Sequence, residues 1–315
     1  MQEQITPSMT VSAAYVGQRT THLMVPMPYD QGVLNADGSV SPTRYLAGNP
    51  TLLSEVGQIS GTATIGDQSY NSLQVTAQKR LTSGLQFTAN YTFSKCMTNN
   101  IGYYGQGGQT SQVNWYYQNI YDAAAEWGLC EYDAKSNFVA NGVYSVPFGR
   151  GQKFGQNMNK AADLIVGGWQ ASAILSLHTG FAMSAGNSWS DASGTGSRGP
   201  RADCLTPVQY YGDQNSPLGG YQFFNPSAFA ATSAGTFGSC GVGTVRGPGL
   251  KTIDFNLMKR FAITERQHLE LRGEFINLFN TPILNAPNMG VGSGMGLVQG
   301  SQGERNIQLA LKYSF

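Results

Sequence analysis

Few residues in this chain could carry out catalytic chemistry. Its three histidines are His22, His178 and His268, and His178 follows Ser172 and Ser176 at even spacing. On a strand these two serines and His178 share one face, which is the starting point for a serine hydrolase. Residues two apart on a strand, however, lie about 6 to 7 Å apart, too far for the hydrogen bond that activates a serine. A solvated histidine is the favoured interpretation, and no catalytic residue is predicted.

The four cysteines are Cys96, Cys130, Cys204 and Cys240, and all fall in segments whose composition predicts loops. Three pairings are possible, and pairing of sequence neighbours joins Cys96 to Cys130 and Cys204 to Cys240. Each disulfide would then close one loop in an oxidising compartment. A metal site is the alternative, but no C-x-x-C spacing and no nearby histidine supports it. We predict two disulfides, no metal and no cofactor, with unpaired thiols as the remaining alternative.

Composition narrows the class of protein. Of the 315 residues 12% are charged, the formal net charge is +1, and the 40 glycines, 16 tyrosines and 15 phenylalanines suit turns and aromatic strands. Scattered lysines and arginines, 19 in all, do not form the basic surface that a nucleic-acid partner requires. No run of about 18 apolar residues predicts a membrane-spanning helix, and the opening MQEQITPSMT lacks the features of a signal peptide.

Apolar and polar residues alternate along eight segments, which are therefore predicted to be strands. In LQFTANYTFSK, which begins at Leu85, one face carries Leu, Phe, Ala, Tyr and Phe, and the other carries Gln, Thr, Asn, Thr and Ser. Each predicted strand thus has one apolar and one polar face. The clearest segments are 85–95, 169–181, 268–275 and 306–315, and the weaker ones are about 9–17, 70–81, 136–148 and 251–261.

The predicted connections alternate in length. Short turns lie at 82–84 and 263–267, and the link at 149–166 has room for a helical turn. Long links rich in Gly, Ser, Asn and Pro span 18–68, 96–135, 184–249 and 280–304. In hydrocarbon every backbone N–H and C=O must be paired, so strands cross a bilayer only in a closed sheet with one apolar face.

The pattern therefore predicts an all-β fold, an antiparallel transmembrane β-barrel wall of about eight strands. A soluble β-sandwich is the alternative, but its long loops would occur at both ends. It would also not require aromatic residues at the ends of the apolar faces, as an interfacial girdle does. The residues of this predicted girdle are Trp169, Phe181, Phe148, Tyr313 and Phe315.

Five blocks of sequence extend this interpretation. They are YNSLQVTAQKRLTSGLQFTANYTFSK (70–95), VYSVPFGRGQKF (143–154), GGWQASAILSLHTGFAM (167–183), GTVRGPGLKTIDFNLMKRF (243–261) and LELRGEFINLFNTP (269–282). In this order and spacing, over nearly its whole length, the chain resembles the C-terminal barrel of Oar-like TonB-dependent outer-membrane transporters, a family of receptors with a carboxypeptidase-regulatory-like domain. The resemblance implies that residues 1–315 are a partial barrel domain from a barrel of about 22 strands. The plug, the regulatory-like domain and the signal peptide would be absent.

The same resemblance implies partners and an orientation. The terminal strand, with Tyr313 and Phe315, would be read by the barrel-assembly machinery, and the C-terminus would lie in the periplasm of a Gram-negative-type cell. The long loops would be extracellular and would bind an unknown ligand, outer-membrane lipid would surround the wall, and a TonB-type energising complex would act through the missing plug. The chain would be a fragment of a transport receptor and not an enzyme. The alternatives are a stand-alone eight-stranded adhesin or structural barrel and, less favoured, an outer-membrane hydrolase.

The polar faces would line the barrel lumen. The candidate lumen-lining residues are Gln170, Ser172, His178, Asp254, Asn256, Glu270, Arg272, Glu274 and Lys312. The charges among them could contact a substrate or plug, but a cross-strand charge ladder that stabilises the wall is the favoured interpretation. Lys79 and Lys259 fall on apolar faces next to short turns, where each is expected to extend to the headgroups. Aromatic residues of the link at 101–128 would either capture a ligand or pack within the loop: Tyr103, Tyr104, Trp115, Tyr116, Tyr117 and Trp127.

Overall fold

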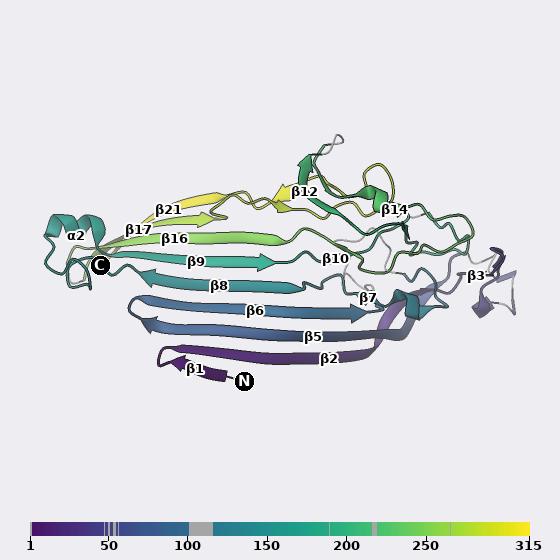
Figure 1. The fold of residues 1–315 in the computed structure, drawn as a ribbon, viewed down its shortest axis with the longest axis horizontal. Coiled ribbons are helices and arrows are strands. Elements are labelled where there is room, and N and C mark those ends of the chain that lie inside the picture. The colour runs from purple at the N-terminus through teal and green to yellow at the C-terminus, as the bar shows by residue number, and fades with distance from the viewer. Residues whose placement is uncertain are drawn as a thin grey trace.

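The computed structural model describes residues 2–46, 48–49, 51–52, 55, 57–100, 116–188, 190–215, 219–264 and 266–315. Their main element is a ten-stranded antiparallel sheet whose long strands follow one another in chain order (Figure 1). The eight long strands are β2 (Met9–Pro28), β5 (Ser60–Thr82), β6 (Leu85–Thr98), β8 (Ser136–Ser145), β9 (Trp169–His178), β16 (Leu250–Ala262), β17 (His268–Ile276) and β21 (Asn306–Ser314). All eight predicted strands are confirmed.

Two short strands complete the sheet. β1 (Gln2–Thr6) pairs with the start of β2, and β7 (Gly128–Leu129) pairs with the end of β6. The sequence did not predict β1, because QEQIT is short and mostly polar and shows no alternation over a useful length.

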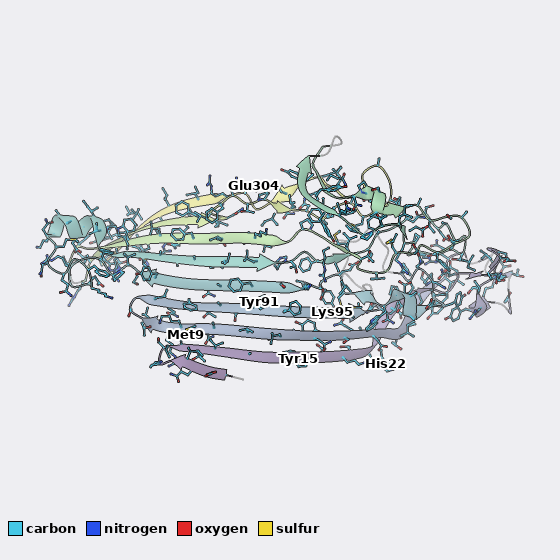
Figure 2. All side chains as sticks on the ribbon, in the orientation of Figure 1. Met9, Tyr15, His22, Tyr91, Lys95 and Glu304 are labelled. Carbon is cyan, nitrogen blue, oxygen red and sulfur yellow. A yellow bond between two sulfur atoms is a disulfide. The ribbon has the colours of Figure 1, made fainter. Side chains whose placement is uncertain are left out.

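The cross-strand register keeps one apolar and one polar face across the whole wall. One row of register partners reads Phe87, Gly142, Ala173, Phe255, Phe275 and Ile307. A row on the opposite face reads Gln86, Val143, Ser172, Asn256, Glu274 and Gln308. The side chains on both faces can be followed in Figure 2, where Met9 and Tyr15 mark the apolar face of β2 and Tyr91 that of β6. Alternation within each strand therefore becomes a continuous apolar surface and a continuous polar one.

β2 and β5 are longer than predicted. Alternation placed them at about 9–17 and 70–81, whereas they pair with each other as far as Pro28 and Ser60. The register shifts around Leu23, next to His22, which has a left-handed φ of 61°. Beyond the part of the wall where one face is apolar, the side chains of both faces contact water or loops, so alternation is no longer required and the sequence signal fades.

The two ends of the sheet differ. At the short-turn end lie the connections 83–84, 146–168 and 263–267, together with the C-terminus (Figure 1). The connection 146–168, which we name the α2 turn, contains α2 (Lys160–Val166), so the predicted helical turn is present. At the loop end the described residues of the connections 29–59, 99–135, 179–249 and 277–305 form an assembly that we name the loop cap.

The loop cap contains short elements of its own. They are β3 (Val33–Leu34), β4 (Val40–Ser41), η1 (Arg44–Leu46), η2 (Ala123–Glu126), β10 (Ala182–Met183), β11 (Asp203–Cys204), β12 (Tyr210–Asn215), β13 (Tyr221–Phe224), η3 (Pro226–Ala228), β14 (Phe229–Ala230), β15 (Val245–Arg246), β18 (Ile283–Leu284), β19 (Leu297–Val298) and β20 (Ser301–Gln302). None of the helices in the described ranges is long and apolar enough to cross a membrane.

The buried apolar core lies at the loop end. One cluster joins residues from two long connections, including Met183, Phe224, Val245 and Met289. A second cluster packs Tyr117 against Val25 and Met27 of β2 and against Ile120. The wall itself presents its apolar face outward, so the loop cap is the part of the described chain that folds around a conventional core.

α2 begins at a side-chain cap that can be tested directly. Asn159 Oδ1 accepts a hydrogen bond from the backbone N–H of Ala162 at 2.8 Å. Replacement of Asn159 by Ala should destabilise α2 by about 1 kcal/mol, because this N–H loses its partner. Faster hydrogen exchange at Ala162 would show the effect. The matched control is Asn157→Ala, which changes an exposed asparagine outside the helix and should leave that exchange rate unchanged.

Candidate functional site

The charged residues of the polar face interact mainly along one strand. Arg272 Nη2 lies 2.5 Å from Glu270 Oε1, and its Nη1 lies 3.4 Å from Glu274 Oε1, all on β17. The predicted ladder was cross-strand, and Lys312 does face Glu270 in the register between β17 and β21. The ion pairs found among the described residues here, however, join neighbours two apart on β17, because Arg272 lies between its two carboxylates and can reach either. Water and salt screen such half-exposed pairs, so they stabilise the wall only weakly.

Most of the other predicted lumen residues contact neighbouring residues of the wall and its loops. Asp254 Oδ1 accepts a hydrogen bond from the backbone N–H of Asn277 at 2.8 Å, which secures the loop end of β17. Asn256 faces Ser172 on β9 and Glu274 on β17, so the register brings these three residues together. Gln170 Nε2 lies 3.5 Å from Ser145 Oγ, at the far end of the same face.

His178 is oriented by a carbonyl group and an aromatic ring. Its Nδ1 lies 2.9 Å from the carbonyl oxygen of Thr179, so Nδ1 is the protonated donor, and its ring lies 5.1 Å from that of Phe181. Phe181 was predicted on the apolar face. That prediction is wrong, because β9 ends at His178 and the Thr179–Gly180 step interrupts the alternation. In the described ranges His178 is therefore held without a serine or carboxylate partner, and the Ser–His geometry of a hydrolase is not formed.

A large pocket of about 900 Å³ lies within the loop cap, between the connections 179–249 and 277–305, and reaches His178 and Leu250 at the loop ends of β9 and β16. Side-chain amides supply most of its polar groups, and no Asp, Glu, Lys or Arg is among its lining residues in the described chain. Its lining includes His178, Phe181, Met183, Asn285, Asn288, Gln299 and Gln302. An uncharged lining with amide donors and acceptors and a few apolar surfaces suits a neutral ligand that forms hydrogen bonds.

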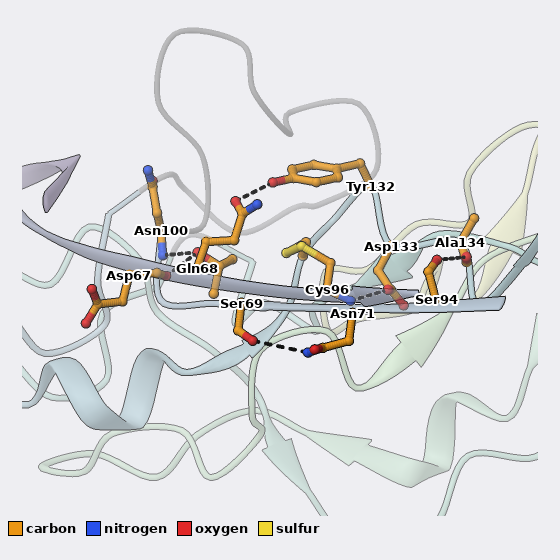
Figure 3. Close-up of a disulfide and its surroundings, with 12 residues drawn as sticks. Asp67, Gln68, Ser69, Asn71, Ser94, Cys96, Asn100, Tyr132, Asp133 and Ala134 are labelled. Carbon is orange, nitrogen blue, oxygen red and sulfur yellow. Dashed lines mark hydrogen bonds between the residues drawn. A yellow bond between two sulfur atoms is a disulfide. The ribbon is translucent and has the colours of Figure 1, made fainter. Parts of the chain in front are cut away.

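A smaller pocket of about 300 Å³ has Cys96 among its lining residues. Figure 3 shows the Cys96–Cys130 disulfide with its polar neighbours, including Tyr132. Tyr132 closes the pocket on one side and donates a hydrogen bond from its hydroxyl to Gln68 Oε1 at 2.6 Å. Burial raises the pKa of the Tyr132 phenol, so this group stays protonated and remains a donor. The polar-face lining comes from Tyr70, Gln74, Thr92, Ser94 and Asn137.

Two disulfides, Cys96–Cys130 and Cys204–Cys240, hold the loop cap. These are the sequence-neighbour pairs, although Cys96 lies at the end of β6 and not in a loop. The first disulfide is reinforced by Asp133, whose Oδ1 accepts from the Cys96 backbone N–H at 2.7 Å and whose other oxygen pairs with Arg246. Two connections of the loop cap are thereby tied to the wall and to each other.

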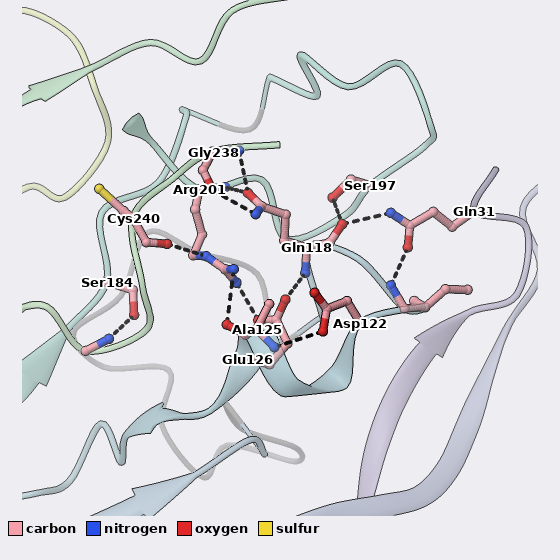
Figure 4. Close-up of polar contacts among 12 residues, drawn as sticks. Gln31, Gln118, Asp122, Ala125, Glu126, Ser184, Ser197, Arg201, Gly238 and Cys240 are labelled. Carbon is pink, nitrogen blue, oxygen red and sulfur yellow. Dashed lines mark hydrogen bonds and ion pairs between the residues drawn. The ribbon is translucent and has the colours of Figure 1, made fainter. Parts of the chain in front are cut away.

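A buried ion pair forms the centre of the loop cap (Figure 4). Arg201 and Glu126 are almost fully buried and bond directly to each other, and Arg201 Nε also donates to the carbonyl oxygen of Cys240 at 2.7 Å. Glu126 Oε1 accepts from the backbone N–H of Gln118 at 2.9 Å. Burial raises the pKa of Glu126, and the adjacent Arg201 acts in the opposite direction. The pair links the connections 99–135 and 179–249.

Two glutamines extend this network to a third connection. Gln118 Oε1 accepts from the backbone N–H groups of Arg201 and Gly238 at 2.9 and 3.1 Å. Gln31 Nε2 donates to the carbonyl oxygen of Gln118 at 2.8 Å, and Gln31 Oε1 accepts from the N–H of Ile120 at 3.0 Å. Three of the four connections of the loop cap are therefore joined in one hydrogen-bonded network, in which the side chains of Gln31 and Gln118 satisfy backbone groups far apart in sequence.

The two lysines on the apolar face have local partners. Lys79 Nζ donates to Ser8 Oγ and Thr82 Oγ1, at 3.2 and 2.9 Å, beside its short turn. Lys259 is only 3% exposed and donates to the carbonyl oxygens of Ile165 and Gly167 at the end of α2. The prediction that Lys259 extends to the headgroups is therefore wrong, because the helix end offers unpaired carbonyl groups at a shorter reach.

The sequence matches the model of one known protein family over nearly its whole length. A family model described as "Outer membrane beta barrel domain" matches residues 1–308. The chain belongs to this family. Its apolar face is thus the surface that meets the lipid of an outer membrane, and its polar face is the lumenal side of a barrel wall.

Solved structures of outer-membrane receptors and transporters are similar at low identity. The siderophore receptor PiuA from Acinetobacter baumannii is 8% identical, with a TM-score of 0.44, and the match covers 98% of this chain and 26% of that one. For the outer membrane transporter YddB from Escherichia coli the identity is 10%, the TM-score 0.44, and the coverage 100% of this chain and 31% of that one. The chain therefore spans less than a third of the length of these proteins. Among curated proteins, no sequence matches the chain.

Sequence patterns did not reveal the residues that organise this outer-membrane chain at its loop end. Arg201, Glu126, Gln118 and Gln31 belong to no motif, and the cysteines were the sole indication that the loops have a defined fold. Of the aromatic residues at 101–128, Tyr117 is fully buried in the second apolar cluster and Trp127 is 42% exposed. Tyr103, Tyr104 and Trp115 lie outside the described residues.

Proposed function

We propose that this chain is the C-terminal part of the barrel of an Oar-like TonB-dependent transporter. The observation that carries the proposal is that each of the two end strands of the wall has one edge without a partner strand among the described residues. Within the described residues β1 and β21 each pair with one neighbour, and on β21 Leu309 and Leu311 are 75% and 66% exposed. A barrel wall in hydrocarbon needs every strand edge paired, so further strands are expected beside these edges.

The orientation follows from the same proposal. The short-turn end and the C-terminus would face the periplasm, and the loop cap would face the outside of the cell. The terminal residues Tyr313 and Phe315 would be recognised by the barrel-assembly machinery, and the energising TonB-type complex would act through a plug supplied by another part of the protein.

The role of this part would be ligand capture and passage, without catalysis. The large pocket lies within the loop cap and reaches His178 on the polar face, so a ligand arriving from outside would meet it at the entrance to the lumen. Its uncharged amide lining favours a neutral, hydrogen-bonding ligand over a strongly charged one. The arrangement of His178 against Thr179 and Phe181 supports the non-enzymatic proposal.

Peptide mass spectrometry of native outer membranes tests this proposal. Peptides from residues 1–315 should be found in a polypeptide clearly larger than 33.8 kDa, together with peptides from a plug and from additional strands. Recovery of these peptides only from a 33.8 kDa species would instead support the stand-alone adhesin or structural barrel.

A further inference from the structure

The α2 turn exposes a group of large apolar side chains at the short-turn end. Leu164 and Ile165 are 54% and 71% exposed, and Val166, Phe148 and Phe154 are also exposed. Phe148 and Phe154 pack against each other, with their ring centroids 5.2 Å apart. Five exposed apolar side chains within one short connection would be unfavourable in water, which indicates a contact beyond the chain itself.

The α2 turn is attached to the apolar side of the wall. Trp169 and Lys259 are register partners on the apolar face, next to the short-turn end. Trp169 Nε1 donates to the carbonyl oxygen of Ile165 at 2.9 Å, and Lys259 Nζ donates to the same oxygen at 3.1 Å. The last turn of α2 therefore lies over the face that meets lipid, and its exposed side chains continue that face past the ends of the strands.

Lys259 fixes this position. Its ammonium group lies 4.8 Å from the ring centroid of Trp169 and 5.0 Å from that of Phe261, between two aromatic residues at the rim of the apolar face. A cation at the C-terminal carbonyls of a helix is stabilising, and the cation–π contacts add to this. The helix end is thus held against the wall by three kinds of contact.

The α2 turn also carries an excess of positive charge. Arg150, Lys153 and Lys160 are exposed, and Lys153 Nζ lies 5.4 Å from the ring centroid of Phe154. The single carboxylate, Asp163, accepts from the backbone N–H of Arg150 at 2.8 Å and faces the connection itself. Exposed apolar side chains next to exposed cations are typical of segments that lie in the headgroup layer of anionic membranes.

We propose that the α2 turn is an interfacial anchor that lies in the phospholipid leaflet on the short-turn side of the membrane. Leu164 and Ile165 enter the boundary between headgroups and acyl chains, and Arg150, Lys153 and Lys160 contact anionic headgroups. The anchor fixes the depth of the wall in the membrane. This inference rests on the membrane-spanning part of the proposed function.

The experiment uses the complete polypeptide that contains residues 1–315, folded into vesicles of phosphatidylcholine and phosphatidylglycerol. The four cysteines of residues 1–315 are all in disulfides. Once any free thiol elsewhere in the polypeptide has been replaced, one introduced cysteine can therefore carry an environment-sensitive fluorophore. The test variant is Ile165→Cys. Leu73→Cys is the matched lipid control, because Leu73 lies on the apolar face between Tyr15 and Phe93 and is 47% exposed. Leu205→Cys, 61% exposed in the loop cap, is the matched water control.

The anchor predicts a blue-shifted emission at position 165 and a loss of fluorescence with lipids that carry a nitroxide close to the headgroup. A nitroxide deep in the acyl chains should have a smaller effect. If lipid nitroxides quench the fluorophore at the lipid control, position 73, but affect position 165 no more than the water control, position 205, the anchor is overturned. The membrane-spanning wall would still stand. Protection of position 165 from both lipid and aqueous quenchers would assign the surface to a protein partner and would also overturn it. No lipid quenching at any position would contradict the wall itself.

Discussion

Replacing Arg201 with methionine is expected to destabilise the loop cap by about 3 to 5 kcal/mol, because the buried carboxylate of Glu126 loses its charged partner. Both side chains are almost fully buried, so water cannot take the place of the guanidinium group. The change should be visible as faster hydrogen exchange of buried loop-cap amides such as those of Ile120 and Ala202. The wall strands should exchange as before, since the pair contacts the loops and not the wall.

The loss of stability in Arg201→Met should grow as the pH rises. Burial already raises the pKa of Glu126, and Arg201 opposes that effect, so loss of Arg201 raises the pKa further. The folded variant then binds a proton that the unfolded chain does not bind above its carboxyl pKa of about 4.3. The stability of the variant should therefore be highest in acid and should fall as the pH rises through the raised pKa.

The double variant Glu126→Gln, Arg201→Met is the matched control. It keeps an acceptor for the Gln118 N–H but leaves no buried charge, so its defect should be smaller than that of Arg201→Met at pH 7 and should not depend on the ionisation of this pair. Equal exchange rates for the single and double variants from acid to neutral pH would show that the buried carboxylate is not what destabilises the single variant.

Introducing an arginine at Ala89 is expected to destabilise the wall by about 2 to 4 kcal/mol, because its charge would lie in the hydrocarbon near the middle of the membrane. Ala89 is on the apolar face of β6, between Ala77 and Ala140. The matched control is Thr88→Arg, one residue earlier on the lumenal face between Gln78 and Asn141. That side chain meets water, so the control should change stability by no more than about 0.5 kcal/mol.

Equilibrium unfolding by denaturant in lipid vesicles measures both free energies. A similar cost at positions 88 and 89 would mean that the two faces of β6 share one environment, which would contradict the assignment of one face to lipid and the other to water. A larger cost at Thr88 would mean that the assignment of the faces is reversed.

The wall could be predicted from sequence because its physics is local. A strand between lipid and water must alternate residue by residue, so Leu85, Phe87 and Ala89 identify both the strand and its outer face. The same logic failed at Phe181, where a two-residue step after His178 ended the strand, and at His22, where the register shifts in a part of β2 that lies beyond the apolar face.

The loop cap could not be predicted in this way, because its contacts join residues that are distant in the chain. Gln31 and Gln118 are 87 positions apart, and Gln118 and Arg201 are 83 positions apart. Nothing in the local sequence around a buried glutamine marks its partner, whereas cysteines can bond only to other cysteines and permit few pairings. Lys259 is a second example. The alternation of its strand predicted correctly that it lies on the apolar face, but it could not predict that its partner is a carbonyl group at the end of α2.

The central claim is that one face of this wall meets lipid and the other meets water. Spin labels placed singly at each residue from Leu85 to Phe93 on β6 test it most directly, because collision rates with oxygen report lipid and those with a water-soluble nickel chelate report solvent. Along this strand the apolar face carries Leu85, Phe87, Ala89, Tyr91 and Phe93. The structure predicts high oxygen access at these five positions and high chelate access at the alternate ones, with a period of two. Equal access of both reagents at odd and even positions would contradict the membrane-spanning wall and everything built on it.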